Sequence, residues 1–263
     1  MLPKCAVGTR ALFVRVTLII VALALLPLGT HAWGPPSGGP TIRLKPDPTG
    51  HATTGHATTG HATNYQADLW SSSSLGTIDT NVFNLALGAA NCAVRSGAVT
   101  NPSTLTVIDY SKPSTRKRLW VFDLRSHELV YEELVAHGQG SGGNVPTLFS
   151  NEPETHRTSL GLFVTEGTYI GKNGYSLRLD GLDRGWNDRA RERAIVMHGA
   201  PYVSEQFAQA QGRLGRSWGC PALREGVARA VIDRVKGGGL VFAYYPDQDW
   251  LNASRYLGGC NSN

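Results

Sequence analysis

The sequence predicts a mainly β domain, a β-rich sandwich or partly open barrel with a few peripheral helices. The first observation is a series of short apolar segments, rich in β-branched and aromatic residues and separated by glycine-rich loops. The second is that only two stretches of the folded part carry apolar residues at helical spacing. The third is size: 263 residues, 41% of them hydrophobic, provide one sizeable core or at most two small ones.

The expected strands share a length of four to eight residues and a high content of Val, Ile, Leu, Tyr and Phe. They span residues 105–110, 119–124, 129–136, 162–165, 175–179, 194–197 and 240–245. Residues 79–95 predict a helix, with Asp79 or Thr80 as the N-cap. A second helix is expected from about Ala222 to Lys236, where a run of three glycines ends it.

Residues 1–32 have the three-part layout of a secretory signal peptide. Basic residues precede an apolar run over residues 16–26, and the small-residue site Thr30-His31-Ala32 follows. An uncleaved membrane anchor is the alternative, although the apolar run is short for a span of roughly 20 residues. We therefore expect export to the periplasm or cell wall, with membrane contact only during export.

Residues 33–75 predict a disordered low-complexity linker, and the catalytic domain is then expected over residues 76–263. Pro, Gly, Thr, Ser and His dominate the linker, which contains tandem HATTG repeats from His51 onward. Such a composition does not bury enough apolar surface to offset the entropy of ordering the chain. A metal-binding histidine tract is the alternative interpretation of the repeats.

The net charge does not favour a nucleic-acid partner. The formal charge is +5, and it falls to +2 without the three basic residues of segment 1–32. A nearly neutral chain without a Lys/Arg stripe lacks the positive surface that phosphate backbones require.

Three cysteines remain after the signal segment, which contains Cys5. An exported protein is permitted disulfides, and an odd count leaves at least one thiol free or intermolecular. A Cys92–Cys260 bridge with reduced Cys220 is the natural interpretation, but the sequence leaves the pairing open.

The residues suited to chemistry gather in segment 194–224. Cys220 follows Gly219 and precedes Pro221, which suits the first position of a helix. A sulfur at a helix N-terminus favours the thiolate, the nucleophilic form of cysteine. The backbone N–H groups of Gly219 and Cys220 are expected to hold an oxyanion, and His198 at the end of a strand is the candidate general base.

Other interpretations of these residues remain open. Arg216 and Arg224 would add positive potential for a thiolate or a substrate carboxylate. His137 either lines the cleft or is a loop histidine bonded to backbone. His137, His198 and Cys220 would together offer three zinc ligands, although zinc sites usually show closer ligand pairs.

Several ordered segments resemble the murein L,D-transpeptidase catalytic domain family, the YkuD-type cysteine transpeptidases. The resemblance runs from about Val82 to Tyr245, and it rests on residues 108–111, 118–124, 137–142, 158–163, 175–182 and 215–222, with the His-Gly pair at 198–199. It implies that Cys220 is the acylated nucleophile and His198 its base. The family commonly has His where this chain has Trp218, and Arg where it has Ala222.

The resemblance implies a β-rich, barrel-like L,D-transpeptidase fold and acyl transfer on bacterial peptidoglycan stem peptides. A neighbouring stem amine as acceptor gives a 3→3 cross-link, water gives an L,D-carboxypeptidase, and an envelope lipoprotein lysine gives an anchored lipoprotein. No metal or organic cofactor is expected. The alternative is a non-catalytic wall-binding or structural protein that retains the fold. The catalytic residues are Cys220, His198 and Gly219, and the expected substrate contacts are Arg216, Ser217, Trp218, Arg224, His137 and Gly199.

Overall fold

The computed structural model describes residues 64–258 and 260, so the proposed signal segment and the histidine repeats lie outside the described residues. The folded domain begins about ten residues before the expected boundary. Tyr65 and Trp70 are buried, and the Trp70 ring packs edge-on against Phe83 and Phe122. The end of the predicted linker is therefore part of the core, because two isolated aromatic side chains anchor it there.

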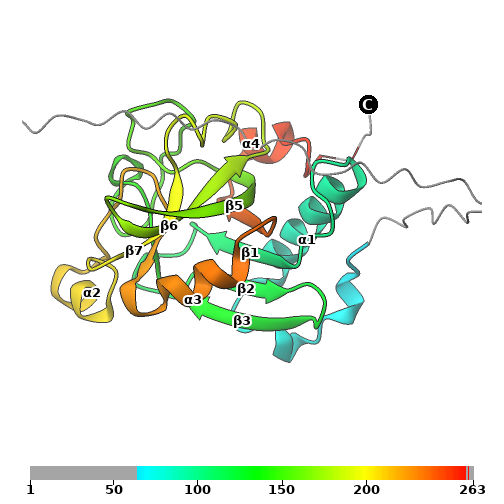
Figure 1. The fold of residues 1–263 in the computed structure, drawn as a ribbon, viewed down its shortest axis with the longest axis horizontal. Coiled ribbons are helices and arrows are strands. Elements are labelled where there is room, and N and C mark those ends of the chain that lie inside the picture. Colours follow the sequence, from blue (N-terminus) through cyan, green and yellow to red (C-terminus); the bar gives the residue numbers. More distant parts are fainter. Residues whose placement is uncertain (1–63, 259, 261–263) are drawn as a thin grey trace, which may run out of the picture. The chain divides into compact units, whose positions relative to one another are not determined.

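One nine-stranded mixed sheet forms the centre of the domain (Figure 1). Its strands are β1 (Thr104–Asp109), β2 (Leu119–Asp123), β3 (Glu128–Glu133), β4 (Val135–Ala136), β5 (Gly161–Gly171), β6 (Gly174–Gly181), β7 (Val196–Ala200), β8 (Ala222–Arg224) and β9 (Leu240–Tyr244). Their spatial order is β3-β2-β1-β9-β5-β6-β7-β8-β4. The predicted mainly β class is confirmed.

The sheet curls until its two outermost strands nearly meet. β3 and β4 stand at opposite ends of the strand order, yet only Leu134 separates them along the chain. Across this seam, Glu133 of β3 accepts two hydrogen bonds from the Arg224 guanidinium of β8, at 2.6 and 2.9 Å. The sheet therefore curves into the expected partly open barrel, in which its two end strands lie close together.

Four short helices surround the sheet: α1 (Thr80–Arg95), α2 (Glu205–Gln211), α3 (Glu225–Val235) and α4 (Gln248–Ala253). α1 packs on β1 and β9, whereas α3 packs on β7, and α2 and α4 lie toward opposite edges of the view in Figure 1. Asp79 caps α1 as predicted, accepting hydrogen bonds from the next turn. Within the described residues, none of the helices combines the length and apolar character that crossing a bilayer requires.

The second predicted helix begins three residues later than expected. Residues 222–224 form β8 and α3 starts only at Glu225, so Pro221 does not occupy a first helical position. The reason is tertiary: Ala222 and Leu223 are fully buried and pair with β4 on one side and β7 on the other. Sheet pairing therefore overrides the local helical signal at this point.

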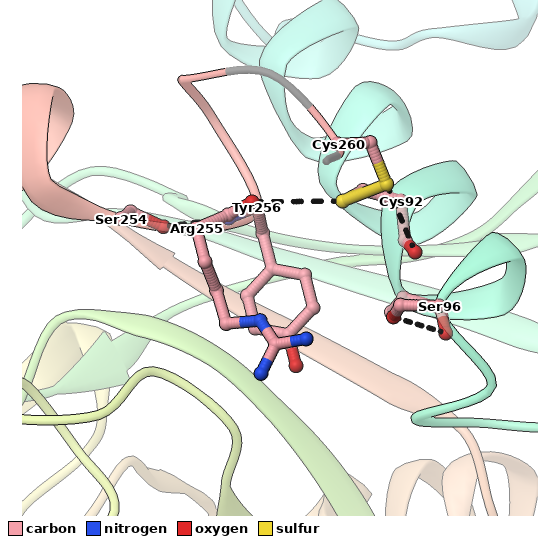
Figure 2. Close-up of a disulfide and its surroundings, with 7 residues drawn as sticks. Cys92, Ser96, Ser254, Arg255, Tyr256 and Cys260 are labelled. Atoms are coloured by element: carbon pink, nitrogen blue, oxygen red, sulfur yellow. Dashed lines mark hydrogen bonds between the residues drawn. A yellow bond between two sulfur atoms is a disulfide. The ribbon is translucent and has the colours of Figure 1, made fainter. Parts of the chain in front are cut away.

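A disulfide joins Cys92 of α1 to Cys260 near the C-terminus, confirming the natural pairing (Figure 2). The two α carbons are 5.2 Å apart and 168 residues apart in sequence. Cys220 is the free thiol among the described cysteines. The bridge closes nearly the whole folded domain into one covalent loop.

Reducing this bridge is expected to lower the free energy of unfolding by about 2–5 kcal/mol, because the unfolded chain regains the freedom of a long loop. Thermal unfolding with and without a reductant measures the change. A Cys92→Ala/Cys260→Ala double variant is the control and should not respond to the reductant. An unchanged unfolding temperature of the native protein would contradict the expectation.

Candidate active site

Cys220 lies in the turn that leads into β8, directly before Pro221. The expected position at a helix N-terminus is wrong, since three residues of strand separate this turn from α3. The helix dipole therefore does not act on the sulfur in the way the sequence suggested. The surroundings of the sulfur are instead set by the neighbouring strand β7.

The Cys220 sulfur is held against the backbone that enters β7. Sγ lies 3.4 Å from the Val196 N–H and 3.8 Å from the Ala194 carbonyl oxygen. The residue is 8% exposed, and this burial raises the pKa of the Cys220 thiol, an effect partly opposed by the Val196 N–H and the charge of Arg193. The sequence suggested a lowered thiol pKa, but burial outweighs the nearby donors and raises the pKa of Cys220, which favours the protonated thiol.

His198 lies in the middle of β7 rather than at the end of a strand. It pairs with Ser176 of β6 on one side and with Ala222 of β8 on the other. Cys220 is two residues before Ala222, so the α carbons of Cys220 and His198 are roughly 8 Å apart, given strands about 4.8 Å apart and a rise of about 3.3 Å per residue. Neighbouring strands thus bring the predicted nucleophile and base into one region.

The state of the His198 ring is fixed by its own chain. Nδ1 lies 2.9 Å from the Gly199 carbonyl oxygen, which only accepts, so Nδ1 carries the proton and Nε2 is the basic nitrogen. Burial lowers the pKa of His198, which keeps the imidazole neutral near pH 7. Among the described residues no hydrogen bond joins His198 to Cys220, so the proton-transfer contact remains a prediction.

The turn before Cys220 is held by Ser217. Its Oγ donates to the Cys220 carbonyl oxygen at 2.6 Å and accepts from the Gly219 N–H at 3.1 Å. Ser217 therefore supports the framework of the turn, and its expected contact with substrate stays a prediction. The Gly219 N–H is already engaged, which leaves the Cys220 N–H as the remaining backbone donor of the two expected to hold an oxyanion.

Two glycines allow this turn to approach a neighbouring loop. A Cβ on Gly138 would lie 2.3 Å from the His156 carbonyl oxygen, and one on Gly219 would lie 2.7 Å from that of Arg157. Gly219 also has a φ of +116°, a left-handed conformation that disfavours any side chain. The Thr158 hydroxyl joins both segments, accepting from the Gly138 N–H and donating to the Gly219 carbonyl.

Both arginines that were predicted to receive a substrate carboxylate already contact acceptors within the protein. Arg224 forms the paired contact with Glu133 at the seam, which raises the pKa of the Arg224 guanidinium. Arg216 donates to the Gly142 carbonyl oxygen at 2.7 Å. The structure therefore assigns both side chains to internal contacts.

His137 and Gly199, also expected to contact substrate, face protein. His137 is fully buried, and its Nδ1 lies 2.7 Å from Nη2 of the buried Arg118. Burial and the charge of Arg118 lower the pKa of His137 to about 3. A Cβ on Gly199 would touch Ala228 of α3, so this glycine permits close packing of the helix.

Trp218 is the predicted contact that remains open to solvent. Its side chain is 67% exposed and lies two residues before Cys220. One face of the indole stacks on the His156 ring, with centroids 4.7 Å apart and planes 9° from parallel. The stack orients the exposed indole, and its role as an apolar rim of the site stays a prediction.

The model of the L,D-transpeptidase catalytic domain family matches residues 75–244. This chain belongs to that family. The match covers all nine strands and includes His198 and Cys220, so the resemblance stated from the sequence is confirmed.

Solved structures of this L,D-transpeptidase family also resemble the chain, at low identity. An L,D-transpeptidase from Mycobacterium smegmatis is 16% identical, with 56% of this chain and 60% of that chain covered and a TM-score of 0.35. An L,D-transpeptidase from Stackebrandtia nassauensis is 15% identical, with 61% and 66% covered and a TM-score of 0.34. The chain thus spans about 60% of the mycobacterial protein. No curated protein matches significantly.

The zinc alternative gains no support from the L,D-transpeptidase domain. Across residues 64–258 and Cys260, no three His, Cys, Asp or Glu side chains are grouped as metal ligands. His137 is turned to Arg118, and His198 donates to its neighbouring carbonyl.

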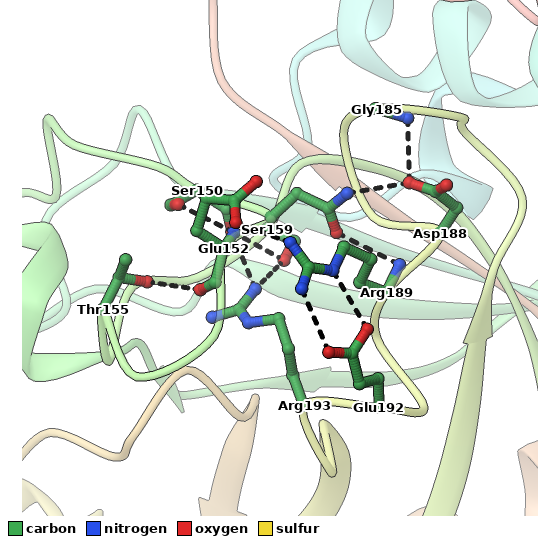
Figure 3. Close-up of polar contacts among 10 residues, drawn as sticks. Ser150, Glu152, Thr155, Ser159, Gly185, Asp188, Arg189, Glu192 and Arg193 are labelled. Atoms are coloured by element: carbon green, nitrogen blue, oxygen red, sulfur yellow. Dashed lines mark hydrogen bonds and ion pairs between the residues drawn. The ribbon is translucent and has the colours of Figure 1, made fainter.

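Arg193 is a residue of this L,D-transpeptidase domain that the sequence reasoning missed. Its guanidinium donates to the carbonyl oxygens of Ser150 and Arg157 and to the Ser159 hydroxyl, as Figure 3 shows for the two serines. A Cβ on Gly219 would lie 3.4 Å from Arg193 Nη2, so the cation borders the residue before Cys220. Its charge lowers the pKa of the thiol, against the effect of burial.

We expect Arg193→Met to raise the pH at which the Cys220 thiol is alkylated, because the variant loses the nearest cation. A tenfold slower reaction at neutral pH would correspond to about 1.4 kcal/mol of lost thiolate stabilisation. The measurement is the rate of reaction with a small alkylating reagent as a function of pH. Arg193→Lys retains the charge and is the control; superimposable pH profiles of all three proteins would refute the electrostatic role.

Proposed function

We propose that this L,D-transpeptidase domain transfers acyl groups from bacterial peptidoglycan stem peptides through a Cys220 acyl-enzyme. The observation that supports this proposal most strongly is the position of the sulfur beside β7, with the neutral imidazole of His198 on the same strand. Family membership supports the substrate class. A protonated thiol next to a neutral base suits a nucleophile that ionises as it attacks.

In the proposed acylation, Sγ attacks the carbonyl carbon of the amide after the third stem residue. The thiol proton passes to His198 Nε2, and the tetrahedral oxyanion faces the Cys220 N–H. Collapse breaks the carbon–nitrogen bond, and the imidazolium returns its proton to the departing amine, a terminal D-Ala. A thioester on Cys220 and a neutral His198 remain.

The acceptor decides the product. A neighbouring stem amine resolves the thioester into a 3→3 cross-link, water gives an L,D-carboxypeptidase product, and an envelope lipoprotein lysine gives an anchored lipoprotein. Each acceptor loses a proton to His198 and restores the thiol. We further propose that residues 1–32 export the protein to the periplasm or cell wall, where these donors and acceptors are located.

Incubating the purified protein with disaccharide-tetrapeptides tests the proposal. We expect an intact-mass increase equal to the donor minus D-Ala, followed by dimers, tripeptides or both. Disaccharide-tripeptides, which lack the leaving residue, are the matched control and should give no adduct. Absence of both adduct and product from the tetrapeptide would favour the alternative of a non-catalytic wall-binding protein, which the raised thiol pKa would then explain.

A further inference from the structure

A small pocket lies between β6 and the backbone that enters β7. Its volume is about 230 Å³, and Tyr169, Arg178 and Val196 contribute to its lining. Ala194 and Val196 also line it, and these are the two residues whose backbone contacts Cys220 Sγ. One stretch of backbone therefore separates the pocket from the candidate nucleophile.

Arg178 is the uncommitted cation of this pocket. It lies on β6 directly opposite Val196 and is exposed. Its guanidinium carbon sits 4.3 Å from the centre of the Tyr169 ring, which orients the planar group without neutralising it. In the described part of the chain, Arg178 forms neither an ion pair nor a side-chain hydrogen bond.

The other charged groups around the pocket are paired with one another. Arg191, which also lines it, donates two hydrogen bonds to Asp180, at 2.6 and 2.7 Å, and forms an ion pair with Glu166. These two carboxylates are therefore engaged by Arg191, and the positive charge of Arg178 brings the four groups to neutrality. Arg178 remains the group with unused donors, in a planar fork that matches a carboxylate.

We propose that the pocket is the subsite for a carboxylate of the acyl donor, and that Arg178 binds that carboxylate. The α carbons of Arg178 and Cys220 flank β7 from its two neighbouring strands, which places them roughly 10 Å apart. An extended arginine side chain spans much of that distance. A donor attacked at Sγ would therefore place, within reach of Arg178, a carboxylate that lies close to its scissile amide. Arg193, Arg216 and Arg224 are committed to protein acceptors and do not compete.

This inference rests on the proposed function, because it identifies the donor group that the same site would recognise. Stem peptides offer two such carboxylates: the terminal one of the leaving residue and the one on the diamino-acid side chain. Donors with either group converted to a carboxamide distinguish these sources. Removal of the Arg178 side chain should abolish the contribution of one of these carboxylates to donor binding. That carboxylate is the one the pocket binds.

The test compares binding of the three donors to Cys220→Ala with binding to Cys220→Ala/Arg178→Gln, by calorimetry. We expect Arg178→Gln to weaken the unmodified donor by about 10–100-fold, the range for a charge-assisted contact. Arg178→Gln should not weaken binding of the donor in which the carboxylate bound by Arg178 has been converted to a carboxamide. Arg178→Lys should restore part of the affinity, and Lys172→Gln, on the same hairpin, is the matched control for a lost surface charge.

Equal binding of the unmodified donor with and without the Arg178 side chain would overturn the subsite. Because binding is measured without the nucleophile, this result does not depend on turnover. Failure of the wild-type protein to form an acyl-enzyme, with the Arg178 effect on binding retained, would reject the proposed reaction and leave the carboxylate subsite in place.

Discussion

Cys220→Ala is expected to abolish acyl-enzyme formation and product release, because the described residues contain no other free thiol. Among the described residues, the other two cysteines are joined in the disulfide. Loss of a covalent nucleophile removes the reaction route itself, so the remaining rate should equal that of the donor in buffer. The measurement is product formation from disaccharide-tetrapeptides, with intact mass reporting the adduct.

The control for this substitution is the fold. Alanine is smaller than cysteine and stays apolar, and the hydrogen bonds of Sγ to Val196 and Ala194 are weak, so the protein should remain folded. Product formed by a folded Cys220→Ala protein at the wild-type rate would eliminate the cysteine mechanism. Cys220→Ser, which retains the shape with a less acidic nucleophile, should likewise form no detectable acyl-enzyme, which here would be an oxygen ester.

His198→Ala is expected to reduce the acylation rate by about 10²–10⁴, the usual contribution of a general base. Burial raises the pKa of the Cys220 thiol and so disfavours the thiolate, which makes a base that accepts the thiol proton important. Single-turnover acylation, followed by mass spectrometry, measures the loss. Added imidazole should restore part of the rate by entering the space left by the ring.

The pH dependence provides a second measure of His198. Burial lowers the pKa of this imidazole from 6.5, so the base stays active to lower pH than an exposed histidine. The acidic limb of the kcat/KM profile should therefore fall below pH 6.5 and disappear in His198→Ala. An acylation rate and profile unaffected by the substitution would exclude His198 as the base.

The strands of this fold were readable from the sequence because most of them, such as β1, β2 and β9, bury a run of apolar residues. The missed elements lack that signal. β8 has three residues, too few to show alternation, and α2 has no buried residue and hence no apolar stripe. α4 buries a single side chain, Trp250. The early start of the domain was equally hidden, since two aromatics in a polar stretch form no periodic pattern.

The residue types of the candidate site were predictable, but their environments were not. The sequence indicated Cys220 and His198 because a strand and a glycine-flanked cysteine suit a nucleophile and its base. It could not show that burial raises the thiol pKa, because burial depends on which strands pack around the sulfur. No local pattern separates Arg193 from Arg189, which forms exposed ion pairs with Glu152 and Glu192.

The burial of Cys220 has a consequence for its reactivity toward oxidants and disulfides. Thiol–disulfide exchange and oxidation to sulfenic acid both proceed through an accessible thiolate. A sulfur that is 8% exposed, with its pKa raised by burial, offers little of it, which favours the coexistence of the Cys92–Cys260 bridge and the free Cys220 thiol in one chain. Burial thus protects the candidate nucleophile from side reactions.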